Sequence, residues 1–392
     1  MIIKNAEVYT EDGSFEVGDV YVAGDTIVEN LEALRCQNDS AAFDALSDTV
    51  IDGSGFYLIP GLTDIHFHGC KGRDFCEGTQ EAMDEIAAYE AGVGVTTIVP
   101  ATMTLPEEEL FKICEASAAY YEAQIKGEKK GKAVFCGINL EGPFISQSKA
   151  GAQNRAYIKV PDVDFFAKLW QRSKGLIKLV AIAPETEGAI PFIESLKQEV
   201  KLSVAHSAAD YDKAMEAFWA GASHVTHLYN AMPPFSHRAP GVIGAAADAE
   251  AEVELICDGV HVHPSVVRAT LKMMGEDKVI FISDSMMATG LADGAYSLGR
   301  QPVEVKGNMA LLEDGTIAGS VTNLMDCLRI AVKEMQIPLE TAVKCAAVNP
   351  AKSVGIYDKY GSITPGKKAN LVLLDKKDLK VKHVILQGEL LG

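Results

Sequence analysis

The sequence lacks the marks of a protein that is exported or embedded in a membrane. Its first residues, MIIKNAEVYTEDG, alternate apolar and polar side chains without a basic segment followed by an apolar one, so we expect no signal peptide. No apolar run approaches the ~20 residues of a membrane-spanning helix. The eight cysteines form no CxxC pair, and we expect free thiols in a reduced, cytoplasmic protein at Cys36, Cys70, Cys76, Cys114, Cys136, Cys257, Cys327 and Cys345.

Nucleotide-binding fingerprints and an excess of basic residues are also missing. No GxGxxG follows the first strand of the predicted barrel, and no GxxxxGK[ST] occurs anywhere. The chain has 36 Lys and Arg against 54 Asp and Glu, for a formal net charge of -18. This charge disfavours binding to nucleic acid or to an anionic membrane. An anionic substrate would need a local basic group to offset the overall field.

What the sequence does contain is enough apolar material for a large core. It has 392 residues, of which 48% are hydrophobic and 23% charged, as is typical of a globular protein with one large and one small domain. In the middle of the chain, apolar runs alternate with helical patterns such as TQEAMDEIAAYEA and DKAMEAFWAGA. Near-continuous apolar runs are typical of parallel strands buried on both faces. We expect such strands at 62–69, 95–104, 133–142, 177–185, 200–208, 224–231, 253–262 and 279–285.

Eight strand–helix units in succession favour a closed barrel over an open doubly wound sheet. The two ends of the chain differ from the middle, because short strand patterns there are separated by glycine and aspartate turns. The sequence therefore predicts an α/β protein. It would consist of a (β/α)8 TIM barrel over 59–354 and a small β-sandwich domain built from 1–58 together with 355–392.

Six of the predicted strands end in residues that bind metals or transfer protons. The first ends in a His-x-His pair, whose i, i+2 spacing on a strand puts both imidazoles on one face. Each of the others ends in a single His, Glu or Asp, and the C-terminal rim of a barrel would bring them all together. The residues are His66, His68, Glu141, His206, His227, His261 and Asp284.

Each of these residues also has an ordinary structural interpretation. A single histidine is more often a packed or surface residue than a ligand, and we expect this of His224 and His237. Glu141 could form an ion pair. Asp284 could cap a helix, or it could take a proton from an attacking water and pass it to a leaving group. The coincidence of six strand ends favours a shared site.

Imidazole and carboxylate groups suit zinc, iron, manganese or cobalt, and we expect zinc or iron. Glu141, His206 and His227 alone would hold one divalent ion with an open coordination position. If His66 and His68 also bind, a second ion fits and Glu141 can bridge the two. The sequence therefore predicts a centre of one or two divalent metal ions.

Longer motifs resemble known proteins. PGLTDIHFHG in the first strand and GSITPGKKANLVLLD near the C-terminus resemble the amidohydrolase superfamily. Within it, the chain closely resembles the N-acetylglucosamine-6-phosphate deacetylase family, from the first strand to the last. The strongest marker is HLYNAMP at 227–233 with RAPG at 238–241. LEGPF, AHS, DGVH, SDS, DGTIAGS and NPA are further matches.

This resemblance implies hydrolysis of the acetamide of N-acetylglucosamine 6-phosphate to glucosamine 6-phosphate and acetate. It implies that Glu141, His206 and His227 are metal ligands and that Asp284 is the catalytic acid and base. Some family members lose the His-x-His pair of the first strand and use one metal. This chain keeps the pair, so two metals are possible.

The resemblance also implies a set of substrate contacts. Arg238 would bind the phosphate, for which a planar guanidinium is well suited. In this family the arginine can come from the partner subunit, so a homodimer is implied. Some members carry a histidine where this chain has Gln153, which could form hydrogen bonds but could not act as an acid. The implied substrate-binding residues are Ala152, Gln153, Asn230, Ala231, Arg238, His261, Ile317, Ala318 and Gly319.

Three alternatives stay open from the sequence. The substrate could be N-acetylgalactosamine 6-phosphate, because loop geometry distinguishes one axial hydroxyl. The enzyme could instead act on a cyclic amide or an aminated base, although many cyclic-amide members use a carboxylated lysine at the end of the fourth strand. This chain has Ala183, Pro184 and Glu185 there. A non-catalytic relative should have lost some of the ligands, and all of them are present.

Overall fold

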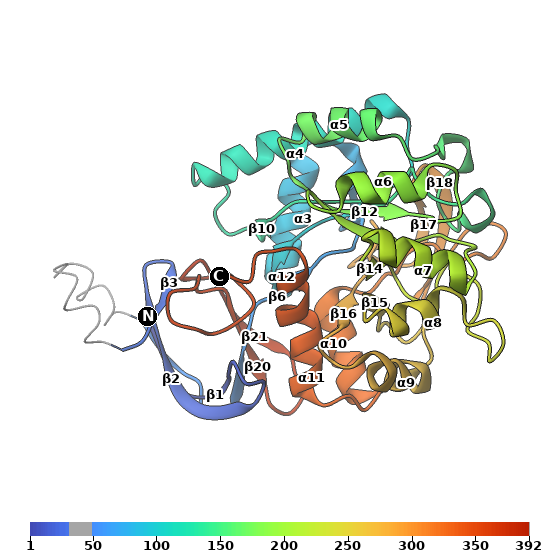
Figure 1. The fold of residues 1–392 in the computed structure, drawn as a ribbon. Helices are drawn as coiled ribbons and strands as arrows, with labels where there is room; N and C mark the ends of the chain where they lie inside the picture. Colours follow the sequence, from blue (N-terminus) through green and yellow to red (C-terminus); the bar gives the residue numbers. More distant parts are fainter. Residues whose placement is uncertain (31–48, 392) are drawn as a thin grey trace.

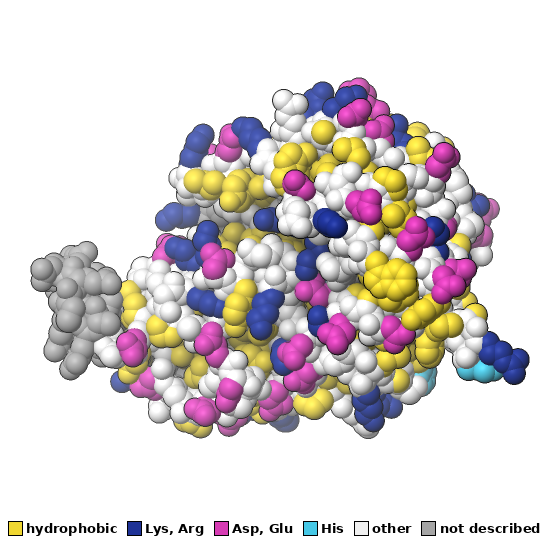
Figure 2. Space-filling view, in the orientation of Figure 1, with side chains coloured by type: hydrophobic (Ala, Val, Ile, Leu, Met, Phe, Trp, Pro, Cys, Tyr) yellow, Lys and Arg dark blue, Asp and Glu magenta, His cyan; other side chains and the backbone are white. Residues whose placement is uncertain are grey.

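A computed structural model describes residues 1–30 and 49–391, and Cys36 lies outside them. Parallel strands with helices around them form the larger part of the molecule, on the right of Figure 1. Strands from both ends of the chain lie on the left. Acidic and basic side chains are interspersed over the face in Figure 2. The seven described cysteines are free, as expected.

The parallel strands follow one another in chain order around a curled sheet. Their hydrogen-bonded orders are β10-β9-β6 and β11-β12-β13-β14-β15-β16, and a parallel bridge between Ala101 and Asn139 joins the two sets. The strands are β6 (Leu62–Asp64), β9 (Val95–Ile98), β10 (Val134–Phe135), β11 (Ile138–Leu140), β12 (Ile177–Ile182), β13 (Lys201–Val204), β14 (His224–Val225), β15 (Glu252–Ile256) and β16 (Val279–Ile282).

Every predicted run overlaps one of these strands, and the third run is divided between β10 and β11. The strands are shorter than predicted, because the apolar runs continue into the turns at their C-terminal ends. Beyond the ends of the sheet, the segments after β16 and β6 also meet: the backbone N–H of Asp284 donates to the His66 carbonyl at 2.9 Å, and that of His68 donates to the Ser285 carbonyl at 2.7 Å.

Helices cover the outer face of the curled sheet (Figure 1). Several begin at a side chain that caps the first turn, such as Thr79, Asp162 and Asp210. Both helical patterns singled out in the sequence are helices in the structure. The described helices are α3 (Gln80–Gly92), α4 (Glu107–Ile125), α5 (Val163–Arg172), α6 (Ala189–Leu196), α7 (Tyr211–Ala220), α8 (Gly241–Asp248), α9 (Pro264–Met274), α10 (Leu324–Lys333), α11 (Leu339–Val343) and α12 (Asn349–Ser353).

The sheet has an apolar face on its enclosed side. Ile65, Val99, Leu179, Ile256 and Ile282 belong to one buried cluster although they come from strands spread around the sheet. Since these side chains contact one another, they lie inside the curl. Their burial stabilises the sheet and leaves the carboxyl ends of the strands free to carry polar residues.

A second sheet is built from both ends of the chain. β5 pairs with β20 in antiparallel register, from Phe56 with Asp375 to Pro60 with Leu371. The eight strands are β1 (Ile2–Tyr9), β2 (Phe15–Ala23), β3 (Thr26–Val28), β4 (Val50–Asp52), β5 (Phe56–Pro60), β20 (Leu371–Asp375), β21 (Val381–Leu386) and β22 (Glu389–Leu390). No helix among the described residues is both long and apolar enough to cross a membrane.

A three-stranded antiparallel sheet that is not among the predicted elements follows β16. It consists of β17 (Gly294–Leu298), β18 (Gln301–Lys306) and β19 (Met309–Leu311). The side-chain amide of Gln301 donates to the carbonyl of Ala152 at 2.5 Å. The small sheet therefore lies against the segment that follows β11.

Candidate metal centre

The candidate residues stand on sharp turns just beyond the parallel strands. His206, His227 and Asp284 each lie two residues after the end of β13, β14 or β16. Their φ angles are 43°, 29° and 51°. Positive φ is uncommon for residues other than glycine and tends to occur at functional sites. These turns break the alternation of the strand and direct the three side chains toward one point.

One group of ligand atoms centres on Oε1 of Glu141. The Nε2 atoms of His206 and His227 lie 3.1 and 3.0 Å from this oxygen. The two nitrogens are 3.1 Å from each other, and all three side chains are buried. The structure therefore brings these three residues together, although they come from three separate strand ends.

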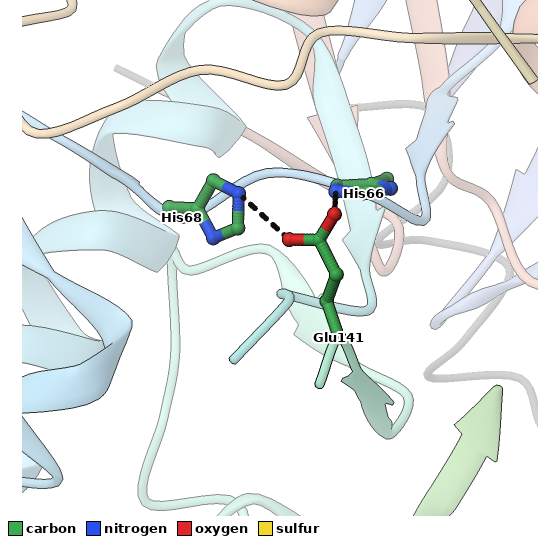
Figure 3. Close-up of side chains that lie close together, drawn as sticks. All are labelled: His66, His68 and Glu141. Carbon is green, nitrogen blue, oxygen red and sulfur yellow. Dashed lines mark ion pairs between the residues drawn. The ribbon is translucent and has the colours of Figure 1, made fainter. Parts of the chain in front are cut away.

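The His-x-His pair forms a second group around the same carboxylate. Nε2 of His66 lies 3.5 Å from Oε1 of Glu141, and Nε2 of His68 lies 3.4 Å from Oε2. Figure 3 shows the carboxylate between the two imidazoles. In each of the two groups, the candidate ligand atoms all lie within 4.8 Å of one another. Glu141 is common to both, as a bridging ligand would be.

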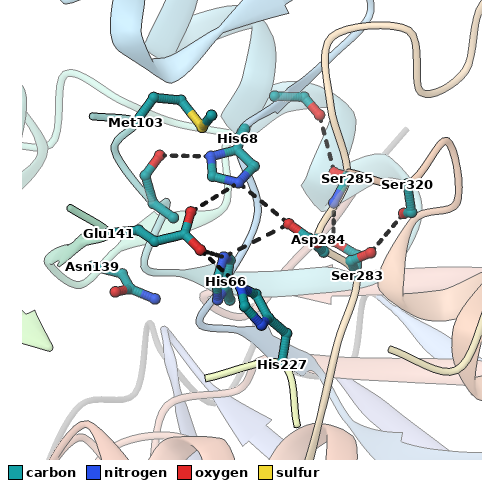
Figure 4. Close-up of polar contacts among 12 residues, drawn as sticks. His66, His68, Met103, Asn139, Glu141, His227, Ser283, Asp284, Ser285 and Ser320 are labelled. Atoms are coloured by element: carbon teal, nitrogen blue, oxygen red, sulfur yellow. Dashed lines mark hydrogen bonds and ion pairs between the residues drawn. The ribbon is translucent and has the colours of Figure 1, made fainter. Parts of the chain in front are cut away.

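Asp284 faces the same point from the end of β16 (Figure 4). Its Oδ1 lies 3.2 Å from Nε2 of His68 and 3.6 Å from Nε2 of His66. Burial alone would raise the pKa of Asp284, but His68 and His66 outweigh it and hold this pKa below its ordinary value. The carboxyl is therefore ionised at neutral pH and can accept a proton.

The pKa of Glu141 is lowered by neighbouring histidines, as that of Asp284 is, and it is lowered further. Burial acts to raise its pKa, whereas His66, His206 and His227 together hold the pKa well below the ordinary value. An ionised, fully buried carboxylate needs positive charge close by. The site therefore has the charge that suits a bound cation.

Two of the candidate histidines are held through Nδ1, as metal-binding imidazoles commonly are. Nδ1 of His206 lies 2.9 Å from the carbonyl oxygen of Lys149, and Nδ1 of His68 lies 3.2 Å from that of Ala101. A carbonyl only accepts hydrogen bonds, so each Nδ1 carries a proton, which leaves each Nε2 as the nitrogen that can offer a lone pair to a metal. Nε2 of His66 has no hydrogen-bond partner among the described residues. Converging lone pairs and a carboxylate fit a divalent metal.

A cavity of about 350 Å³ opens over this cluster. Glu141, His206, His227 and Asp284 contribute to its lining. Six of the nine residues implied as substrate contacts also line it: Ala152, Gln153, Asn230, Ala231, Ile317 and Gly319. The cavity can hold a small molecule, and a bond of that molecule would then lie beside the carboxylates of Glu141 and Asp284.

Gln153 has a more specific place than the sequence suggested. Its Oε1 accepts a hydrogen bond from the Thr104 backbone N–H at 2.6 Å, and its Nε2 donates to Oε2 of Glu141 at 2.8 Å. The side chain is buried. The amide therefore orients the Glu141 carboxylate in addition to lining the cavity.

The other three implied substrate contacts lie outside the lining of this cavity within the single chain. Arg238 is exposed in the loop between β14 and α8, next to the Ser236–Ala239 bridge. Nδ1 of His261 is 2.7 Å from Oδ2 of Asp258. Ala318 is fully buried in the segment between two lining residues.

Sequence reasoning missed Glu254, a fully buried carboxylate beneath the cluster. Its signal was an acidic residue inside the apolar run of β15, where both neighbours are buried valine and leucine. His224 is packed as expected, since it is fully buried and its Nδ1 lies 2.8 Å from Oγ of Ser203. His237 is exposed in the same loop as Arg238.

Comparison with known proteins agrees with this geometry. The model of the amidohydrolase family matches residues 57–391. N-acetylglucosamine-6-phosphate deacetylase of Bacillus subtilis (strain 168) is 37% identical over 395 residues, which cover 100% of this chain and 96% of the relative. The chain belongs to the amidohydrolase family, within the group of N-acetylglucosamine-6-phosphate deacetylases. It is therefore a hydrolase that acts on a carbon–nitrogen bond.

Two further relatives bear on the site. N-acetylgalactosamine-6-phosphate deacetylase of Escherichia coli O157:H7 is 32% identical, over 89% of this chain and 92% of the relative. A mutant N-acetyl-D-glucosamine-6-phosphate deacetylase from Mycobacterium smegmatis was solved in complex with N-acetyl-D-glucosamine-6-phosphate. It superposes with a TM-score of 0.88 at 30% identity and covers 100% of this chain and 99% of that one. The fold and the amino-sugar phosphate chemistry of these relatives are thus closely related.

Proposed function

We propose that this enzyme removes the acetyl group from N-acetylglucosamine 6-phosphate, giving glucosamine 6-phosphate and acetate. The main support is the meeting of Glu141, the two histidines His206 and His227, and Asp284 at one cavity, in a chain whose relatives carry out this reaction. An amide is a poor electrophile, and its amine is a poor leaving group unless it is protonated. The site offers residues that could hold a metal to activate the amide, and a carboxylate that could protonate the amine.

Glu141, His206 and His227 would hold a first divalent ion, and His66 with His68 would hold a second that shares Glu141. We expect zinc or iron, given nitrogen and oxygen ligands. When bound, the metal would supply Lewis-acid activation of the acetamide carbonyl and of the attacking water. The hydrogen bond from Gln153 to Oε2 of Glu141 would restrain the shared carboxylate between the two groups.

Asp284 would carry the proton. As an ionised carboxylate it accepts the proton of the attacking water, and it then donates that proton to the nitrogen of the departing amine. Its position supports this role, because Oδ1 lies within 3.2 Å of His68 and the side chain lines the cavity. His66 and His68 keep it ionised until the proton arrives.

Substrate binding would use both subunits of a homodimer. Asn230, Ala231, Ile317 and Gly319 line the cavity of their own chain. Arg238 is exposed and outside that lining, which suits a guanidinium that reaches the phosphate in the partner's cavity. His261 and Ala318 would support the sugar from behind the lining, and Ala152 from its edge. We expect a cytoplasmic enzyme that binds neither nucleic acid nor membranes.

We also propose that the chain forms a closed barrel and a separate small β domain. The hydrogen bonds between the segments after β16 and β6 support a closed (β/α)8 barrel over 59–354. The sheet shared by the two chain ends supports a separate β-sandwich domain of 1–58 and 355–392, in which its own apolar cluster around Ile3, Leu58 and Leu373 would be the core.

One alternative substrate has a specific observation behind it. The Escherichia coli relative acts on N-acetylgalactosamine 6-phosphate at nearly the same similarity. A cyclic amide is less well supported. β12 ends without a lysine, and Glu185 accepts hydrogen bonds from Oγ of Ser207 at 2.7 Å and from the Ala208 N–H at 2.6 Å.

The test is an assay of acetate release from both 6-phosphorylated N-acetylhexosamines by enzyme of known metal content. We expect kcat/KM to be higher for the glucosamine derivative. A higher value for the galactosamine derivative would change the assigned substrate, and no release from either would refute the proposal.

A further inference from the structure

One buried carboxylate contacts both ligand groups of the centre without being part of either. Glu254 lies in β15 in phase with Ile256, so its side chain points to the enclosed side of the curled sheet. It is 0% exposed. A carboxylate in such a position is costly unless hydrogen bonds or nearby charge compensate for its lost hydration. Its contacts therefore bear directly on its role.

The first contact fixes the ring of His66. Oε2 of Glu254 lies 2.9 Å from Nδ1 of this histidine. Since a carboxylate accepts, Nδ1 carries a proton, which leaves Nε2 as the ring nitrogen that can bind a metal. Nε2 lies 3.5 Å from Oε1 of Glu141 and 3.6 Å from Oδ1 of Asp284. A carboxylate behind a histidine in this way orients a metal-ligating ring and raises its basicity.

The second contact supports the turn that carries His227. The same Oε2 accepts a hydrogen bond from the His227 backbone N–H at 3.0 Å. The main-chain carbonyl of Glu254 accepts from the Leu228 N–H at 2.8 Å. Together these bonds hold the residue at its positive φ of 29°, and this backbone conformation directs Nε2 toward Glu141.

An ion pair with His224 does not explain Glu254 equally well. Oε1 has no hydrogen-bond partner among the described residues, and Nε2 of His224 lies 3.7 Å away. The other nitrogen of that ring is already engaged by Ser203. Both short contacts of the carboxylate therefore go to the candidate metal ligands.

We infer that Glu254 is a positioning residue of the metal centre, which fixes the tautomer of His66 and the backbone turn of His227. The inference rests on the metal centre proposed above and adds a residue outside it. Because each of these histidines belongs to a different ligand group, loss of Glu254 weakens both groups at once.

The test measures zinc binding rather than activity. Metal-free protein is titrated with zinc against a chromophoric chelator, for the wild type, Glu254→Ala and Glu254→Gln. Glu252→Gln is the matched control, because Glu252 lies on the same strand but contacts Lys201 and Ser353. We expect Glu254→Ala to bind zinc about 10–100-fold more weakly. Glu254→Gln should lose less, because its amide oxygen still accepts, and the control should match the wild type.

A folded Glu254→Ala protein with wild-type zinc affinity and stoichiometry would overturn the inference. If that variant does not fold, the zinc-loaded wild type decides the question by NMR of ¹⁵N-labelled histidine, with His66 assigned from a His66→Asn variant. We expect a proton on Nδ1 of His66, and an unprotonated Nδ1 would equally overturn the inference. A wild type that binds no zinc or other divalent metal would instead remove the proposed centre itself.

Discussion

Replacement of Asp284 by asparagine separates proton transfer from every other role of this residue. The carboxamide has nearly the same size, and the backbone bonds of Asp284 stay in place, from its N–H to the His66 carbonyl and from the Ser320 N–H to its own carbonyl. The fold should therefore be retained. An amide cannot accept the proton of the attacking water, nor can it return a proton to the departing nitrogen.

The expected cost follows from general acid–base catalysis. Loss of a positioned proton-transfer group lowers kcat by about 10²–10⁴-fold. This corresponds to about 3–6 kcal/mol in activation free energy, at about 1.4 kcal/mol per tenfold change. KM should change much less, because Asp284 is one of many residues in the lining of the cavity. If Asp284 were only a helix cap, the change would cost about 1 kcal/mol of stability and leave turnover nearly normal.

The assay is steady-state acetate release from N-acetylglucosamine 6-phosphate, with the metal content of each preparation measured. Metal content matters because Oδ1 of Asp284 is only 3.2 Å from a candidate ligand nitrogen. Asp314→Asn is the control, since this aspartate is exposed in the turn before Thr316 at the edge of the cavity. A folded, metal-loaded Asp284→Asn enzyme with near-normal kcat would refute the assignment and leave the general base unknown.

Three further predictions concern the metals and the phosphate. Replacement of both His66 and His68 by asparagine should reduce bound metal by about half; unchanged stoichiometry in elemental analysis would assign the pair another role. Arg238→Ala should weaken binding of the phosphorylated substrate by about 1.5–3 kcal/mol and leave unphosphorylated N-acetylglucosamine unaffected, and equal losses on both would indicate a structural arginine. Removal of metal by a chelator should lower both Tm and activity, because the buried carboxylates and facing imidazoles lose their compensating cation. Re-addition of zinc or iron should restore both. A Tm that does not respond to the chelator would argue against a cation among these side chains.

Much of the architecture could be predicted because strand burial leaves a direct trace in the sequence. The strands β12, β13 and β16 are mostly apolar, and a candidate site residue follows two of them, His206 after β13 and Asp284 after β16. The turns could not be predicted, since nothing in the residue types of His206 or His227 reveals a positive φ. That conformation depends on hydrogen bonds from distant strands, as the Glu254 contact with the His227 N–H illustrates.

Residues whose role depends on partners far away in the chain were the hardest to predict. Gln153 was expected near the substrate from a position in a motif, yet its amide is also bonded to Glu141 and to the Thr104 backbone. The β17–β19 sheet was missed, although YSLGRQPVEVKGNMALL alternates like a hairpin. Its strands are short and half-exposed, so their signal is weak beside that of the buried strands.

The sheet shared by the chain ends has a consequence for biosynthesis. β1 and β5 are made before the curled sheet, whereas β20, which pairs with β5 from Pro60–Leu371 to Phe56–Asp375, is made after it. During translation, β5 has β1 on one side, and its other edge stays open until the segments between β5 and β20 have emerged. Open strand edges are aggregation-prone. Truncation before β20 should therefore lower solubility by leaving this edge of β5 unpaired, and expression of the chain with and without the residues from Leu371 onward would measure it.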